Sequence, residues 1–236
     1  MRLVLTRPEH DAARTAQLLR AQGHDVLLVP LLEVETDRHA ELGEGPWSAL
    51  LMTSANAARA LATHNRIADL RQLPVFVVGR RTAEAARSAG LHDVRSADGN
   101  AADLVRLAAT QIPGARHPLL YVAGEDRARD LAAEFSGFGL TVKTVVIYRA
   151  RAVLELPPPL RAALAGGRVD GVLHFSRRSA DVYVARSAAA GVLDRALSPQ
   201  HFCLSKEVAE PLVAAGAARI QVAARPDEAT LVSSIC

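Results

Sequence analysis

Cysteine and aromatic residues are scarce in this sequence. Only Cys203 and Cys236 are cysteines among 236 residues, and phenylalanine, tryptophan and tyrosine together make up 4% of the chain. Two thiols outside a disulfide-rich pattern are expected to stay unpaired. No group of cysteines and histidines has the spacing of metal ligands, so no metal site is predicted.

Long apolar runs are also missing. Half of the residues are hydrophobic, yet no stretch approaches the roughly 18 consecutive apolar residues that span a membrane. Residues 1–7 contain too short an apolar segment for a signal peptide. We therefore expect a cytoplasmic protein that does not engage a membrane.

Lysine is rare, and arginine supplies almost all of the positive charge. Lys143 and Lys206 are the only lysines, against a formal net charge of +3. Codon bias is one explanation for this excess. The functional explanation is a small anionic substrate, because guanidinium groups match carboxylates in geometry. The arginines form no block and accompany no aromatic platform, so no nucleic-acid partner is predicted.

Short apolar runs alternate with helical patterns along the whole chain. The first helical pattern covers residues 9–22, and Gly23 ends it. Single strands separated by helices indicate parallel β-α-β crossovers and an α/β fold. Residues 37–47 are expected to form a loop. The predicted strands are residues 3–5, 26–32, 49–53, 75–78, 94–95, 119–122, 142–147, 171–175, 202–204 and 219–222.

The order of elements is repeated within the chain. The repeat predicts two similar lobes with parallel sheets, of which one is discontinuous. Residues 1–35 and 148–236 are expected to form the first lobe, and residues 36–147 the inserted second lobe. Two chain crossings then predict a two-strand hinge, with the binding site in the cleft between the lobes. The matched segments are 51–56 with 173–178, 77–84 with 203–210, and 121–149 with 5–33.

Polar residues follow several of the predicted strands. Ligands of parallel sheets gather at the carboxyl ends of the strands, where backbone N–H groups at helix starts also bind anions. Ser54, Thr82 and Ser176 are expected to cap helices, a role that is compatible with ligand binding. The candidate substrate-binding residues are Arg7, Ser54, Asn56, Thr82, Ser176, Arg177 and Arg178.

Tyr148 is the candidate for a chemical step. The repeat aligns it with Leu32, so a phenol replaces an apolar side chain near the second crossing. A phenol can donate a hydrogen bond to a leaving hydroxyl; the alternative is a strand tyrosine that only packs. His174 and Trp47 are both expected to be packing residues.

Several common chemistries lack their motifs. The sequence has no Gly-x-Gly-x-x-Gly, no Walker sequence, no His-Glu-x-x-His and no Gly-x-Ser-x-Gly. A nucleotide-dependent α/β enzyme is therefore disfavoured, and nothing points to a covalent nucleophile.

The motifs, taken in order, resemble those of the uroporphyrinogen-III synthase family over nearly the full length. The resemblance implies two flavodoxin-like lobes joined by a two-strand ladder. The segments that carry it are Leu5-Thr6-Arg7-Pro8, Leu51-Met52-Thr53-Ser54-Ala55-Asn56, Val78-Gly79-Arg80-Arg81-Thr82-Ala83, Gly124-Glu125-Asp126-Arg127, Val146-Ile147-Tyr148-Arg149 and Phe175-Ser176-Arg177-Arg178-Ser179.

The resemblance also implies a reaction without cofactor or metal. Hydroxymethylbilane loses its terminal hydroxyl and closes, through a spiro intermediate, to uroporphyrinogen III with the last ring inverted. Tyr148 matches the tyrosine proposed to assist departure of the hydroxide, while Ser54, Thr82 and Ser176 match turns that bind carboxylates. A monomer is expected. The alternative is a two-lobed binding or sensory module for an anionic metabolite, without turnover.

Overall fold

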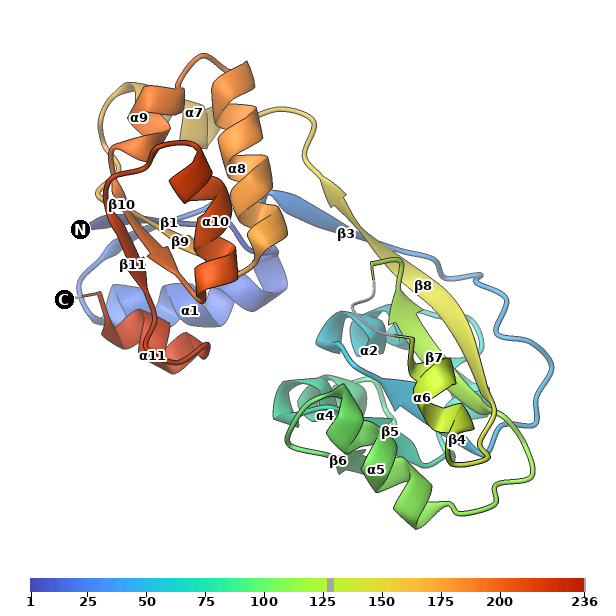
Figure 1. Ribbon diagram of the computed structural model, residues 1–236. Helices are drawn as coiled ribbons and strands as arrows, with labels where there is room; N and C mark the ends of the chain where they lie inside the picture. The colour runs from blue at the N-terminus through green and yellow to red at the C-terminus, as the bar shows by residue number, and fades with distance from the viewer. Residues whose placement is uncertain (127–129, 236) are drawn as a thin grey trace. The chain divides into compact units, whose positions relative to one another are not determined.

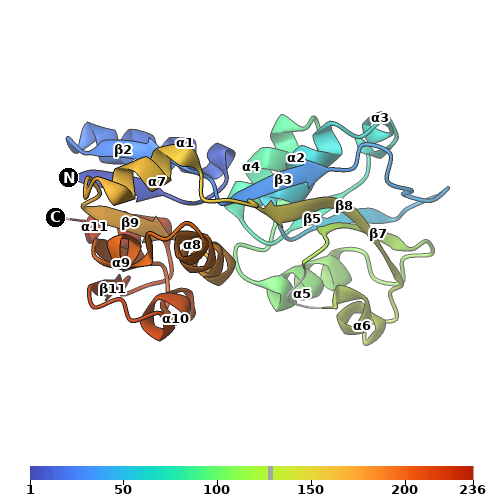
Figure 2. The same cartoon turned by 90° about the horizontal axis from the view of Figure 1, so that it is seen from above.

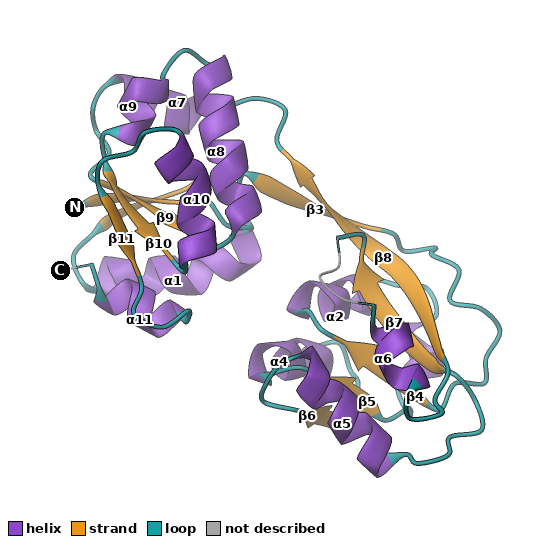
Figure 3. Ribbon diagram, viewed as in Figure 1, coloured by secondary structure: helices purple, strands orange, loops and turns teal. Residues whose placement is uncertain are grey.

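The computed structural model describes residues 1–126 and 130–235, and these divide into two compact units. Unit 1 comprises Met1–Glu33 and Arg151–Cys236, and unit 2 comprises Val34–Ala150. Each unit is an α/β structure in which strands lie between helices (Figure 3). Arg127 and Cys236, which the sequence analysis mentions, lie outside the described residues.

Unit 1 contains a five-stranded sheet in the order β11-β10-β9-β1-β2, and each neighbouring pair is parallel. Its strands are β1 (Arg2–Leu5), β2 (Asp25–Leu28), β9 (Gly171–His174), β10 (Gln200–Cys203) and β11 (Ile220–Val222). Its helices are α1 (Glu9–Ala21), α7 (Pro158–Ala165), α8 (Arg177–Ala189), α9 (Leu193–Leu197), α10 (Lys206–Ala214) and α11 (Glu228–Ser233).

Unit 2 is built on a six-stranded sheet in the order β3-β8-β7-β4-β5-β6. Its strands are β3 (Leu32–Thr36), β4 (Ala49–Met52), β5 (Val75–Val77), β6 (Val94–Ser96), β7 (Leu119–Gly124) and β8 (Val142–Ala152). Its helices are α2 (Ala55–Ala62), α3 (Ile67–Leu70), α4 (Arg80–Ser88), α5 (Ala101–Gln111) and α6 (Leu131–Ser136).

The two sheets have the same spatial order once the strands are matched as the repeat predicts. β1, β2, β9, β10 and β11 correspond to β7, β8, β4, β5 and β6, and both sheets then follow the flavodoxin-like order 2-1-3-4-5. The match of residues 121–149 with residues 5–33 also aligns most of β8 with β2 and the start of β3. The duplication inferred from weak sequence similarity is therefore confirmed by the strand order.

Helices cover both faces of each sheet in the same arrangement. In unit 1, α7, α8, α9 and α10 pack on one face while α1 and α11 pack on the other (Figure 1). In unit 2, α2, α3 and α4 cover one face, and α5 and α6 cover the other (Figure 2). The central strands are buried on both sides, which explains why β4 and β9 consist almost entirely of apolar residues.

One predicted strand is divided in the structure. Residues 26–32 were expected to form a single strand, but β2 ends at Leu28 and β3 begins at Leu32. Pro30 lies in the interval, where it offers no N–H to a ladder. β3 neighbours β8, and hydrogen bonds from Asp37 N to Ile147 O and from Val153 N to Leu31 O show that the two strands run in opposite directions.

The chain passes between the units within β3 and β8. The divisions fall after Glu33 and after Ala150, which lie inside these two strands. A two-strand hinge remains a prediction, because the ladder alone does not establish motion.

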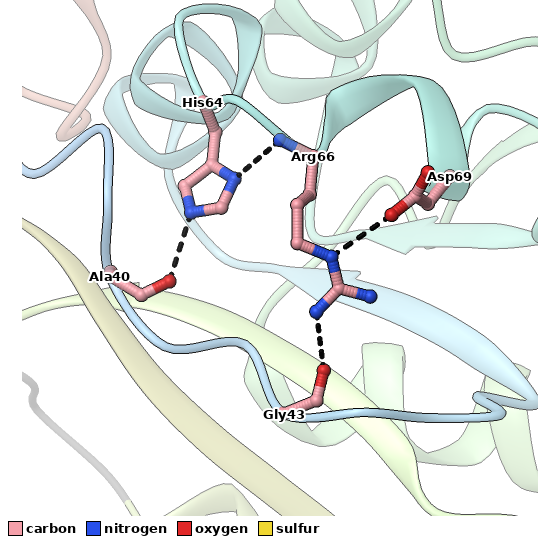
Figure 4. Close-up of polar contacts among 5 residues, drawn as sticks. All are labelled: Ala40, Gly43, His64, Arg66 and Asp69. Carbon is pink, nitrogen blue, oxygen red and sulfur yellow. Dashed lines mark hydrogen bonds and ion pairs between the residues drawn. The ribbon is translucent and has the colours of Figure 1, made fainter.

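The segment between β3 and β4 is a loop, as expected, and polar contacts hold it to the end of α2 (Figure 4). His64 Nε2 lies 2.9 Å from Ala40 O, and His64 Nδ1 accepts the backbone N–H of Arg66 at 3.1 Å. Arg66 donates to Gly43 O at 2.5 Å and pairs with Asp69 at 2.9 Å. The acceptor role of Nδ1 assigns the ring proton to Nε2. The loop therefore has an ordered polar anchor despite its lack of regular structure.

A pair of histidines is buried in the core of unit 1. His174 in β9 and His201 in β10 are fully buried, with His174 Nε2 3.1 Å from His201 Nδ1. Tyr183 packs edge-on to His174 and donates a hydrogen bond to Ala196 O. Burial, and then the neighbouring His201, lower the pKa of His174 well below its usual value. His174 is therefore a packing residue, as predicted.

The same core keeps the thiol of Cys203 protonated. Cys203 is buried and unpaired, and burial raises its pKa to about 12.

Trp47 packs against the core of unit 2, with its ring 5.8 Å from Lys143 Nζ. No helix within residues 1–126 and 130–235 is both long and apolar enough to cross a membrane.

Unit 1 is expected to lose stability in mild acid. Burial lowers the pKa of His201 to about 4, whereas an unfolded histidine titrates near 6.5. Below pH 6.5 the unfolded state binds the extra proton, so stability falls as the pH drops toward 4. His201 alone should lower the free energy of unfolding by about 2 kcal/mol between pH 7 and pH 5. Hydrogen exchange in urea, read separately for the amides of each unit, measures this change.

The variant H174L/H201L removes both titrating groups and should flatten the pH dependence of unit 1. The exposed His117 supplies the control, because H117Q should retain the full dependence. An equally steep loss in H174L/H201L would show that other groups cause the acid sensitivity.

Candidate active site

The carboxyl edge of the unit 2 sheet presents hydroxyl groups from neighbouring strands. Ser54 follows β4 and caps α2, where its Oγ accepts the N–H of Asn56 at 3.1 Å. Asn56 Oδ1 accepts a hydrogen bond from Arg59 at 2.6 Å. The hydroxyls of Thr53 and Tyr121 lie 2.8 Å apart, which connects the residue after β4 with the middle of β7. The Tyr121 hydroxyl was not anticipated, because the sequence shows only a tyrosine inside an apolar strand.

The position of Thr82 differs from the prediction. It was predicted to cap a helix, but Gly79 is the N-cap of α4, and Thr82 is buried within the first turn with 6% of its surface exposed. The start of α4 therefore has no side-chain cap. The first backbone N–H groups of a helix have no partner within the helix and can bind an anion. The predicted capping role of Thr82 is therefore wrong, while its role in ligand binding stays a prediction.

Tyr148 lies in β8 with its ring partly buried against the core of unit 2. Within residues 1–126 and 130–235, its hydroxyl makes no hydrogen bond. Tyr148 also lines a cavity of about 220 Å³ in this unit. The phenol is thus fixed at its base by packing, while its polar end keeps its donor capacity for a ligand. The cavity is lined by Glu35, Thr36, Asp37, Val146, Tyr148 and Arg149.

The corresponding edge of unit 1 also ends in hydroxyl groups. Ser176 caps α8 and accepts the N–H of Ser179 at 3.1 Å, while the two hydroxyls lie 2.7 Å apart. Ser205 begins α10, again without a side-chain cap. The predicted capping role of Ser176, like that of Ser54, is confirmed. Like α4, α10 has no side-chain cap from its N-cap residue, but at α10 the Glu207 carboxylate accepts hydrogen bonds from Ser205 and from its own backbone N–H, which lower its pKa.

The three predicted arginines occupy different environments. Arg177 is exposed and pairs with Glu210 at 2.7 Å, and Arg178 is exposed beside it. Arg7 is buried: its guanidinium lies 3.4 Å from Glu228 and 4.3 Å from the centre of the Phe175 ring. Arg7 therefore already has an internal carboxylate partner. A substrate carboxylate would have to share the guanidinium with Glu228.

No group of three or more histidine, cysteine, aspartate or glutamate side chains is placed to hold a metal ion in the described part of the chain. The polar groups at the two edges are instead hydroxyls, guanidiniums and helix-start N–H groups. Such groups bind and orient carboxylates. Among the described residues, the one candidate with an unbonded phenol is Tyr148.

Together these features define an α/β protein of two doubly wound units, each with hydroxyl groups and helix N-termini at the carboxyl edge of its parallel strands. A family model described as uroporphyrinogen-III synthase HemD matches residues 13–233. The chain therefore belongs to the uroporphyrinogen-III synthase family, as the motifs predicted. This result confirms the predicted enzyme class and gives no support to the binding-module alternative.

Solved structures show the same fold. Uroporphyrinogen-III synthetase from Helicobacter pylori is similar with a TM-score of 0.68 and 16% identity, over 99% of this chain and 98% of that one. A mutant uroporphyrinogen III synthase from the extremely thermophilic bacterium Thermus thermophilus gives a TM-score of 0.52 and 16% identity, over 99% and 96% of the two chains. No curated protein sequence matches the chain.

The Arg7–Glu228 contact is expected to stabilise unit 1. The two side chains are 9% and 21% exposed, and R7M would leave a partly buried carboxylate without its counter-charge. We expect R7M to lower the free energy of unfolding by about 3 kcal/mol. Unfolding in urea, monitored by hydrogen exchange of the unit 1 amides, measures this loss of stability.

Two further variants test the cause. R7M/E228Q should recover much of the loss, because no unpaired charge remains. R177M breaks the exposed Arg177–Glu210 pair, which is 60% and 54% exposed, and should cost less than about 1 kcal/mol. Equal losses in R7M and R177M would argue against a buried ion pair.

Proposed function

We propose that this chain closes hydroxymethylbilane to uroporphyrinogen III and releases water. Membership of the family, over residues 13–233, is the observation that carries this proposal. The substrate loses its terminal hydroxyl, and the last pyrrole ring then attacks through its substituted carbon. The resulting spiro intermediate opens and recloses with that ring inverted. Uncatalysed closure gives the symmetric type I isomer instead.

The proposed task of the protein is chiefly positional. Each pyrrole carries an acetate and a propionate, so helix-start N–H groups, serine hydroxyls and arginines can hold the flexible chain by its carboxylates. Orientation of this kind decides which carbon attacks. The proposed carboxylate-binding residues are those that follow the strands: Arg7, Ser54, Asn56, Thr82, Ser176, Arg177 and Arg178.

The geometry supports these residues unequally. Ser54 and Ser176 cap helices while presenting a second lone pair, and the start of α4 has no side-chain cap. Thr82 and Arg7 are buried, so their contribution is better explained as support for the adjoining turn. Arg177 and Arg178 are exposed, and Arg177 also pairs with Glu210.

Tyr148 is the proposed proton donor. Departure of hydroxide needs a hydrogen bond or a proton on the leaving oxygen, and a phenol supplies either. Its hydroxyl is unbonded within the described residues, so a substrate hydroxyl would not have to displace an internal partner. A monomer, a cytoplasmic location and the absence of a nucleic-acid partner stay predictions.

Isomer analysis tests the overall function. We expect purified protein, given freshly prepared hydroxymethylbilane, to yield mainly the type III isomer, because the bound chain presents its substituted carbon. The products are oxidised and separated by chromatography, with a parallel sample of heat-denatured protein. Type I product alone, at the rate of the denatured sample, would favour a binding module.

Tyr148→Phe tests the chemical step. Loss of the phenolic donor should lower kcat by about 100-fold, the size of a typical general-acid contribution. The stability of unit 2 should change by less than about 1 kcal/mol, because the hydroxyl makes no hydrogen bond within residues 1–126 and 130–235. Steady-state kinetics and urea denaturation followed by Trp47 fluorescence provide the two measurements.

Tyr183→Phe is the matched control. It removes a hydroxyl that donates to Ala196 O within the unit 1 core, so it should cost about 1 kcal/mol of stability and leave kcat unchanged. An unaltered kcat in Y148F would show that Tyr148 only packs and does not take part in the reaction.

A further inference from the structure

β7 and β8 form an irregular ladder at the point where Tyr148 lies. Ala123 pairs with Val146, but Gly124 pairs with Tyr148, so Ile147 is an extra residue in β8. The N–H of Glu125 then donates to Tyr148 O at 3.0 Å. This is the arrangement of a β-bulge, which turns the side chains that follow it. The bulge places Tyr148 directly opposite Gly124.

The phenol of Tyr148 occupies the space that a side chain at position 124 would need. A Cβ on Gly124 would lie 2.6 Å from Cζ of Tyr148, 2.8 Å from its hydroxyl oxygen and 2.9 Å from Cε2. All three contacts are at the hydroxyl end of the ring. Gly124 does not have a positive φ angle, so its backbone conformation does not require glycine. The property of Gly124 that matters here is its lack of a side chain.

An ion pair lies beside the Tyr148 ring and connects the two strands. Glu125 follows Gly124, Arg149 follows Tyr148, and their side chains form an ion pair of 3.1 Å. Both partners are about half exposed, so the pair contributes little free energy. It does connect the ends of the two strands beside the phenol. The bulge, the glycine and the ion pair together leave the ring one position over the end of β7.

We propose that Gly124 is a positioning residue that sets the location of the Tyr148 hydroxyl. This inference rests on the role proposed above for Tyr148. A misplacement of about 1 Å in a catalytic group can cost a factor of about 100 in rate. The three atoms nearest to an alanine Cβ at position 124 all belong to the far end of the Tyr148 side chain, so the fold should tolerate the change better than the reaction does.

Gly124→Ala is the direct test. We expect kcat to fall at least tenfold while KM changes less than twofold, because the carboxylate contacts remain and the hydroxyl moves. Gly137→Ala is the matched control: Gly137 is exposed, has a φ angle of −61° and would bring its Cβ no closer than 3.6 Å to Glu134 O. G137A should retain wild-type kcat.

A double-mutant cycle separates positioning from general damage. In the Y148F background there is no hydroxyl to misplace, so adding G124A should lower kcat by less than twofold. A tenfold further loss in Y148F/G124A would overturn the proposal, because Gly124 would then act by another route. An unchanged kcat in Y148F alone would instead overturn the role of Tyr148, so the two failures are distinguishable.

A spectroscopic measurement does not depend on turnover. The chain has three tyrosines, so ring-labelled tyrosine gives a spectrum that Y148F and Y183F can assign. G124A should shift the Tyr148 ring signal and leave that of Tyr183 unchanged. If the Tyr148 signal stays in place in folded G124A, the positioning role is wrong whatever the kinetics show.

Discussion

Parallel pairing between neighbouring strands is the constraint on which this structure depends. Every ladder within the order β11-β10-β9-β1-β2 is parallel, as is every ladder among β8, β7, β4, β5 and β6. A parallel pair needs a crossover, and each crossover helix begins at the carboxyl edge of its sheet. Helix-start N–H groups and the residues that cap them therefore gather at one edge. Ser54 and Ser176 owe their comparable positions to this geometry, which also separates binding groups from the apolar strands that support them.

The same constraint explains why a weak repeat could be read from the sequence. Strands buried on both faces are short aliphatic runs, and the turns after them keep serine, glycine and arginine in a fixed order. The strand order, the covering helices and the discontinuous unit follow from that pattern. Residues 26–32 are the exception, because an apolar run looks continuous although Pro30 interrupts its ladder. Local composition identifies burial more reliably than it identifies hydrogen bonding.

The candidate site was only partly predictable, for a physical reason. Capping by Ser54 and Ser176 depends on neighbours within three residues, so the sequence contains the signal. Thr82 was assigned a cap, but α4 already begins at Arg80, with Gly79 as its N-cap. Arg7 resembles a free cation until the fold brings Glu228, from the far end of the chain, against it. Contacts between distant segments decide which charges are free, and a single sequence does not encode those contacts in any readable pattern.

Matched positions in the two copies differ in structure at the end of the strand that carries Tyr148. The alignment pairs Tyr148 with Leu32 and Gly124 with Pro8. In unit 1, Pro8 offers no N–H to extend β1, and Leu32 packs in the core. In unit 2, β7 continues to Gly124 and the phenol lies over it. The aromatic ring and the glycine are consequently linked, since the Tyr148 phenol occupies the space that a side chain at position 124 would need.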